Sequence, residues 1–464
     1  MKNGSILRKR EIDMFNKIKL SLKSINYRLF IALLFMGLIP TIYTTFRIFL
    51  LGQMPGDWGF NIASQLSWVN LLYEILQEAL ILPLFFFIGA SIKNKSEMRN
   101  KVRTGLLFTF SIYSLLSLLI IIFAKPLITF MSQNVTLIDA TAEYIRIETI
   151  ANIFITLVKF ILVVLVTIKK EKYLYFVLAL QMVLTIILDI FLVSDLPVSL
   201  NIGVNGIAIT NIIVNILLLV LAIYLLYKED INLFVKEKMS FTWLKKLGKI
   251  GGISGLESFV RNIAFMLMII KMVNMVGEQG TFWVANNFIW GWLLLPVLQL
   301  GELVKRDCGE TEDAIKEKSL GYFAITTIIV LIWFISLPFW EPFMKNILQL
   351  SNYSDVYYIV LISVGFYVFF AYNNVIDSIF YGIGKTNYML FQSIVINSIF
   401  YGTAFILYKV GLYEPTLVKI ALMFAAGTAM DSILTYGMFI WMLKKKKIDI
   451  FNKDRDIENI VLNN

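Results

Sequence analysis

Long apolar segments recur along the whole chain, and each is about as long as an α-helix that crosses a bilayer. Such a helix needs about 20 largely apolar residues. Only 16% of the 464 residues are charged, whereas soluble domains carry about 25%. The pattern therefore predicts an all-α polytopic membrane protein with twelve transmembrane helices. The apolar windows are 28–51, 62–91, 104–124, 144–168, 173–193, 203–227, 252–276, 283–304, 319–340, 355–381, 388–408 and 416–443.

Lysine and arginine are unevenly distributed between the segments that join these windows. With twelve spans, most of the 42 Lys and Arg residues fall at the two ends of the chain and in every second loop. Basic loops stay on the cytoplasmic side, so we expect a multi-pass cell-membrane protein with both termini in the cytoplasm. The net charge of +10 then reflects topology and attraction to anionic membrane lipid, and no nucleic-acid partner is needed to explain it.

The second half of the chain repeats the first. The segment KPLITFMSQN from Lys125 aligns with EPFMKNILQL from Glu341, and TIKKEKYLYF near Lys170 aligns with YGIGKTNYML near Lys385, an offset of about 215 residues. Two six-helix lobes related by a pseudo-two-fold axis along the membrane normal follow from such a repeat, and we expect a monomer. The predicted segments are an N-terminal segment 1–27, an N-lobe 28–228, a linker 229–248, a C-lobe 249–443 and a basic tail 444–464.

Three motifs carry a family resemblance. They are LDIFLVSDLPVSLNIGVNGIAIT (Leu188–Thr210), GGISGLESFV (Gly251–Val260) and YGIGKTNYM (Tyr381–Met389). Their order and spacing resemble those of multidrug and toxin extrusion (MATE) transporters over essentially the whole chain. The resemblance implies alternating access between two lobes, with transport driven by Na⁺ or H⁺. The same superfamily contains flippases for lipid-linked sugars, so the fold does not specify the substrate.

Charged and polar residues at membrane depth are the candidate binding residues, because an ionised side chain there costs about 2.5–3.5 kcal/mol. In the second span, Asn70, Glu74 and Glu78 recur at helical spacing and form one polar face. That face lines a transport cleft or pairs with cations of neighbouring helices. In the seventh span, Glu257 and Arg261 are spaced to pair with each other. Lys271 either extends to the membrane surface or pairs with Glu74 or Glu78.

The second half of the chain adds a further polar face. Glu302 is the deepest charge of the eighth span, and Asn373, Asn374, Asp377 and Tyr381 share a face of the tenth. For Asp431, in the twelfth span, we expect a buried hydrogen bond to a Tyr or Ser. The charged residues considered within the spans are acids at 74, 78, 189, 257, 302, 377 and 431 and bases at 47, 159, 261 and 271.

The resemblance adds an expectation for the first and fifth spans. Many cation-coupled MATE transporters have an aspartate near the end of the first span that works with an aspartate of the fifth. Asp189 matches the second of these acids, but Arg47 stands where the first would be. The resemblance thus implies that the Arg47 guanidinium takes the place of a bound cation beside Asp189.

The C-lobe acid pair of another MATE subfamily is also incomplete, because its positions fall at Phe370 and near Asn262. We infer that the coupling acids have moved to Glu74, Glu78, Glu257 and Asp377.

Two functions remain open. The first is a secondary active exporter of amphipathic, often cationic compounds, which the excess of intramembrane acids favours. The second is a flippase for a lipid-linked or anionic substrate, in which phosphate would be held by Arg47, Lys159, Arg261 and Lys271. The sequence contains no histidine, no phosphate-binding loop and no catalytic triad pattern, so we expect no enzyme activity, no bound metal and no cofactor beyond the coupling ion.

Overall fold

The computed structural model describes residues 14–54 and 58–450, and every regular element in these ranges is a helix. Eleven helices of the described residues are long and apolar enough to cross a membrane, and a pair of helices bent by 52° makes a twelfth span. The predicted all-α fold with twelve spans is confirmed. Several helices extend beyond the apolar windows: α6 covers Lys95–Phe130, where the window was 104–124.

The first six spans use the first half of the chain. The second span is interrupted by a π-helical segment, η1, which holds Glu78. The bounds are α2 (Tyr27–Gly52), then α3 (Trp58–Ala63), α4 (Leu66–Leu76), η1 (Gln77–Ile81) and α5 (Leu84–Gly89) as the second span, α6 (Lys95–Phe130), η2 (Val135–Leu137) with α7 (Ile138–Thr167), α8 (Glu171–Leu192) and α9 (Val204–Lys228).

The last six spans follow after an extended segment. Their bounds are α10 (Leu244–Phe265) with η3 (Met266–Ile270) and α11 (Lys271–Met275), α12 (Gln279–Phe288) with η4 (Ile289–Leu293) and α13 (Leu295–Glu310), α14 (Ala314–Pro342) with η5 (Phe343–Ile347), α15 (Tyr353–Gly382), α16 (Thr386–Val395) with η6 (Ile396–Tyr401) and α17 (Gly402–Lys409), and α18 (Leu417–Lys446).

Local sequence explains where several spans begin and bend. The side chains of Asn26, Asn94 and Thr416 accept a backbone N–H at the starts of α2, α6 and α18, as N-cap residues do. The eighth span bends by 52° between Leu293 and Leu295. A π-helical turn precedes this bend and Pro296 follows it in the first turn of α13, and both features break regular helical hydrogen bonding.

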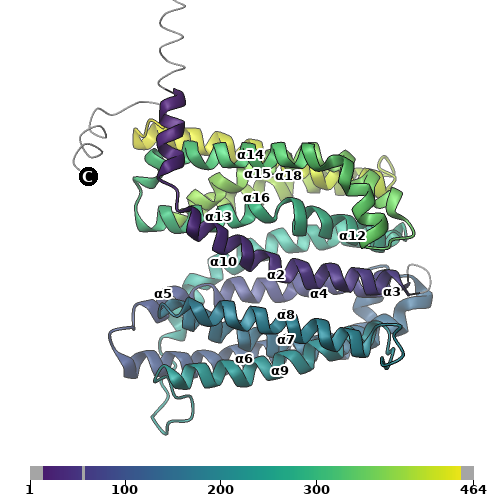
Figure 1. The fold of residues 1–464 in the computed structure, drawn as a ribbon, viewed down its shortest axis with the longest axis horizontal. Helices are drawn as coiled ribbons and strands as arrows, with labels where there is room; N and C mark the ends of the chain where they lie inside the picture. Colours follow the sequence, from purple (N-terminus) through teal and green to yellow (C-terminus); the bar gives the residue numbers. More distant parts are fainter. Residues whose placement is uncertain (1–13, 55–57, 451–464) are drawn as a thin grey trace, which may run out of the picture.

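The two halves pack their helices in the same way. In the first half α7 contacts α6 and α9, and α8 contacts α2; in the second half α15 contacts α14 and α18, and α16 contacts α10. In Figure 1 the helices α6 to α9 of the first half form a layer below α2, α4 and α10, and the helices α14, α15, α16 and α18 of the second half form a layer above them. The contacts between the halves are also paired, because α2 meets α13 while α4 and η1 meet α10.

The segment that joins the halves is bound to the first one. Residues 229–243 run beside the first turns of α6, where Ser240 and Asn100 exchange two hydrogen bonds of 2.8 and 2.9 Å. The Arg103 guanidinium donates to the carbonyl oxygens of Leu233 and Glu237. This segment is therefore held against the first layer up to the start of α10.

Glycine allows α10 to approach the second span closely. A Cβ at Gly251 would lie 1.8 Å from the carbonyl oxygen of Ala79, and one at Gly255 would lie 2.8 Å from the Ala79 Cβ. Two small residues four positions apart let helix backbones meet, as in other membrane helix pairs. The GGISG motif thus fixes the distance between the two halves.

We predict that Gly251→Ala destabilises the protein by about 1–3 kcal/mol, because the added methyl group forces the two helices apart. Gly252→Ala is the matched control, since a Cβ at Gly252 meets nothing within 4 Å. Thermal unfolding of the purified variants in detergent measures the difference. Equal melting temperatures for the two variants would contradict the close packing.

Candidate functional site

A buried ion pair joins the first and fifth spans. The Arg47 Nε atom lies 2.7 Å from Asp189 Oδ2, and the guanidinium also donates to Asn211 Oδ1 on α9 at 2.8 Å. The Asp189 side chain is fully buried and that of Arg47 is 13% exposed. The expected contact between Arg47 and Asp189 is confirmed, so an internal cation stands beside this carboxylate.

The same cluster contains a second carboxylate that the sequence analysis missed. Glu148 on α7 is 1% exposed, and its Oε1 accepts hydrogen bonds from Asn211 Nδ2 at 2.5 Å and from the Tyr144 hydroxyl at 3.4 Å. Tyr144, Glu148 and Asn152 recur at four-residue steps, and this spacing was the signal available in the sequence. The cluster of Arg47, Asp189, Asn211 and Glu148 is called the N-lobe cluster below.

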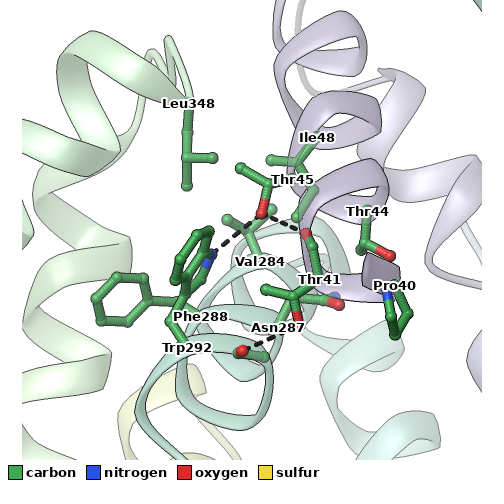
Figure 2. A pocket seen from close by; sticks show the side chains of 11 residues that line it. Pro40, Thr41, Thr44, Thr45, Ile48, Val284, Asn287, Phe288, Trp292 and Leu348 are labelled. Carbon is green, nitrogen blue, oxygen red and sulfur yellow. Dashed lines mark hydrogen bonds between the residues drawn. The ribbon is translucent and has the colours of Figure 1, made fainter. Parts of the chain in front are cut away.

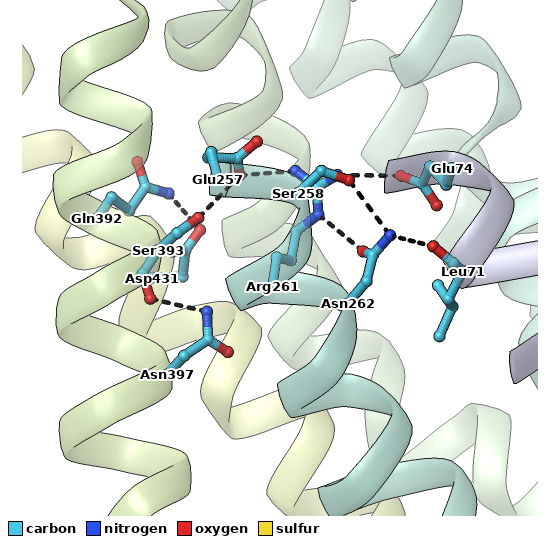
Figure 3. A network of polar contacts seen from close by, with 10 residues as sticks. All are labelled: Leu71, Glu74, Glu257, Ser258, Arg261, Asn262, Gln392, Ser393, Asn397 and Asp431. Carbon is cyan, nitrogen blue, oxygen red and sulfur yellow. Dashed lines mark hydrogen bonds and ion pairs between the residues drawn. The ribbon is translucent and has the colours of Figure 1, made fainter. Parts of the chain in front are cut away.

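A second network connects the two halves through Arg261 (Figure 3). Its guanidinium donates to Glu74 Oε1 on α4 at 3.0 Å and to Glu257 Oε1 on its own helix at 2.7 Å. Glu257 also accepts from the Ser393 hydroxyl on α16 at 2.9 Å. The neighbouring Asn262 donates to the carbonyl oxygen of Leu71. One cation thus holds a carboxylate from each half of the chain.

The Arg261 network lies partly open. The side chains of Glu74 and Arg261 are each 39% exposed, whereas Glu257 is 9% exposed. Glu78 lies one turn beyond Glu74 and lines a small cavity together with Glu257 and Tyr381. No ion pair of Glu78 occurs within the described residues. Because a half-exposed ion pair facing lipid would be costly, this placement favours a cleft between the halves.

A third cluster lies inside the second half and links two acids through amides. Asn373 Nδ2 donates to Asp377 Oδ2 at 2.9 Å and to Asp431 Oδ2 at 3.5 Å, and Gln392 Nε2 donates to the same Asp431 oxygen. The partners expected for Asp431 were Tyr or Ser, and this expectation was wrong, because amide side chains of α15 and α16 reach it. We call these four residues the C-lobe cluster.

Acceptor atoms of the C-lobe cluster lack donors. Asn373 Oδ1, Asp377 Oδ1 and Gln392 Oε1 are buried and receive no hydrogen bond from the described residues. A buried polar atom without a partner costs about 1–3 kcal/mol. Three oxygens in this condition are suited to bind a proton or a hard cation, which prefers oxygen ligands.

An uncharged cavity lies between α2 and the eighth span (Figure 2). It measures about 130 Å³, and its walls carry Thr41, Thr44 and Thr45 on one side and Asn287, Phe288 and Trp292 on the other. The Trp292 indole donates to the Thr45 hydroxyl, and the Thr41 hydroxyl donates to the carbonyl oxygen of Gly291. The cavity therefore combines hydroxyl groups with aromatic rings at the contact between the halves.

Amide side chains join the halves at the membrane end opposite the described chain termini. Gln65 and Asn274 exchange two buried hydrogen bonds of 2.7 and 3.1 Å, and Asn61 accepts from the Gly280 backbone N–H at 3.0 Å. The first pair joins the second span to the end of the seventh span, and the Asn61 bond joins the second span to the start of the eighth.

The remaining predicted residues lie outside these clusters. Lys271 lies over the Phe130 ring, with 3.8 Å from Nζ to the ring centroid, so Arg261 and not Lys271 is the partner of Glu74. Glu302 is 52% exposed and pairs with Lys305. Asn374 donates to the carbonyl oxygen of Val297, and Asn70 is exposed.

Comparisons with known proteins agree with this fold. The MatE family model matches residues 86–191. The chain has the MATE transporter fold. An inward-facing structure of a multidrug resistance MATE family transporter of the MOP superfamily aligns with a TM-score of 0.74 and 17% identity, over 89% of this chain and 95% of that chain. The outward-facing structure of such a transporter aligns with a TM-score of 0.64 and 17% identity, over 92% and 98%.

A third similar structure is a MOP superfamily transporter from Pyrococcus furiosus. Its description says that reverse polarity of its binding pocket suggests a different function. It aligns with a TM-score of 0.64 and 15% identity, over 94% of this chain and 98% of that chain. No curated protein matches the chain. The resemblance to the MATE family read from the sequence is confirmed.

We predict that Arg47→Ala in this MATE-fold protein lowers stability by about 3–5 kcal/mol, because it leaves Asp189 buried without a cation. Adding Asp189→Asn restores part of the loss. A double-mutant cycle on thermal or denaturant unfolding measures the coupling. Strictly additive effects of the two substitutions would contradict a direct interaction.

Proposed function

We propose that the protein is a secondary active exporter of amphipathic, cationic compounds in the cell membrane, with both chain ends in the cytoplasm. Entry of Na⁺ or H⁺ drives the export. The observation that carries this proposal is the C-lobe cluster, where Asp377 and Asp431 are half-buried beside oxygens that receive no hydrogen bond from the described residues. A site of this kind gains a favourable contact whenever a proton or sodium ion enters it.

The charge balance between the halves supports a cationic substrate. Arg47 and Arg261 are each neutralised by carboxylates. The Glu78 carboxylate has no ion pair with the described residues and lines the same small cavity as Tyr381. The Glu78 carboxylate would attract a cationic compound, and the rings of Phe288 and Trp292 in the separate cavity beside α2 would favour an aromatic one.

A flippase for an anionic or lipid-linked substrate is the second candidate. Lys159 favours it, because this lysine lies within α7, is exposed, and has the neutral Gln77 as its hydrogen-bond acceptor at 3.0 Å. One such ammonium group could bind a phosphate or carboxylate. Arg47 and Arg261 already bind carboxylates, which makes the exporter the better-supported function.

The first test uses proteoliposomes with an imposed ion gradient. We expect an inward Na⁺ or H⁺ gradient to drive uphill export of a fluorescent cationic compound. Asp377→Asn abolishes this uphill transport but keeps binding of the compound, because Asp377 serves the ion and not the substrate. Asp355→Asn is the matched control, since Asp355 is exposed in the first turn of the same helix.

Two results would contradict the proposal. Transport at an equal rate without any ion gradient supports the flippase. Unchanged uphill transport by Asp377→Asn would mean that the C-lobe cluster does not couple ion entry to export.

A second test concerns the polar face of the second span. We expect Glu74→Gln and Glu78→Gln to abolish transport while membrane insertion and yield stay normal. Glu74→Gln removes the carboxylate that pairs with Arg261 across the halves, and Glu78→Gln removes the charge of the cavity. Transport assays beside yield and gel filtration separate the two effects. Normal transport by both variants would make these carboxylates packing residues.

A further inference from the structure

The N-lobe cluster holds one fixed cation and two carboxylates. Arg47 contributes the positive charge, and Asp189 and Glu148 are 0% and 1% exposed. With every group ionised, the cluster would carry one uncompensated negative charge inside the membrane. An isolated buried carboxylate is so costly that such groups usually become neutral instead.

No other charged side chain of the described residues bonds to the cluster and supplies the missing cation. Besides Arg47, α2 contributes Tyr43, whose ring lies 5.7 Å from the Arg47 Cζ atom. Helix α8 contributes Asp189, and α7 contributes Tyr144. Helix α9 contributes the neutral Asn211 and Asn215. Among the described residues, Arg47 is the cation that bonds to the cluster.

The hydrogen bonds decide which acid is neutral. Asp189 receives the guanidinium on both oxygens, at 2.7 and 3.4 Å, an arrangement that favours the ionised form. Among the described residues, Glu148 receives side-chain hydrogen bonds from two neutral groups alone, and both end on Oε1. A sodium ion has little to bind there, because Asn211 Oδ1 already accepts from Arg47. Glu148 Oε2 is the place for a proton.

We propose that Glu148 carries one proton on Oε2 and exchanges it with water during the transport cycle. Release breaks the O–H bond and passes the proton to water, and the new carboxylate then shares Arg47 with Asp189. The first span carries Arg47 where the family resemblance implies an aspartate. Glu148 on α7 therefore carries the proton in its place. The assignment of this proton to the cycle rests on the proposed function, whereas its presence on Glu148 does not.

Infrared difference spectra between acidic and alkaline pH, recorded on the full-length protein in lipid membranes, test the proposal. The wild type should give the carbonyl band of a protonated carboxylic acid, and Glu148→Gln should lose the part of that band due to Glu148. Glu143→Gln is the matched control, because Glu143 is exposed on the same helix. A Glu148→Gln spectrum identical to that of the wild type overturns the proposal.

The variant Asp189→Asn tests the charge balance itself. This variant leaves one cation and one carboxylate in the cluster. Arg47 then balances the charge of an ionised Glu148, so the carbonyl band of protonated Glu148 disappears although the residue is present. Persistence of the band in Asp189→Asn would contradict the charge argument. If the wild type shows the Glu148 band but no gradient-driven transport, the proposed exporter is refuted and the protonation of Glu148 is not. Gradient-driven transport without the band would refute this inference only.

Discussion

The cost of an ionised side chain in hydrocarbon governs where the charges of this protein lie. Most of the intramembrane charges meet a partner from another helix, and the two arginines each hold two groups. Arg47 is only 13% exposed, so it needs Asp189 in place before its helices can pack stably. The charges therefore specify which helices are neighbours as much as they prepare a transport site.

Packing and charge act together at the boundary between the halves. Gly251 and Gly255 bring α10 against η1, and this approach places Arg261 within reach of Glu74. One turn further, Glu78 keeps its carboxylate in the adjoining cavity. Among the described residues, this boundary contains one ion pair, Arg261–Glu74, beside small residues and neutral hydrogen bonds such as Trp292–Thr45 and Gln65–Asn274.

Much of the fold could be predicted because the apolar windows and the repeat are local patterns. The Arg47–Asp189 contact could be predicted because the motif comparison supplied both positions. The Glu257–Arg261 pair could be predicted from its four-residue spacing. The second partner of Arg261 could not, since Glu74 lies 187 residues away. Glu148 was missed, although Tyr144 and Asn152 share its face, and amide partners of Asp431 depend on the packing of α15, α16 and α18.

The proposed exporter requires the two halves to rock against each other under control of the coupling ion, since the resemblance to MATE transporters implies alternating access between two lobes. Double electron–electron resonance between spin labels tests this motion most directly. In a Cys308→Ser background, one pair of labels is placed at Ser96 and Glu317 at one end of the molecule. A second pair is placed at Val135 and Leu412 at the other end, and all four positions are exposed. We expect a change in Na⁺ concentration or pH to lengthen the distance within one pair of labels and to shorten the distance within the other. Distances that stay fixed at both ends under all ion conditions would contradict it.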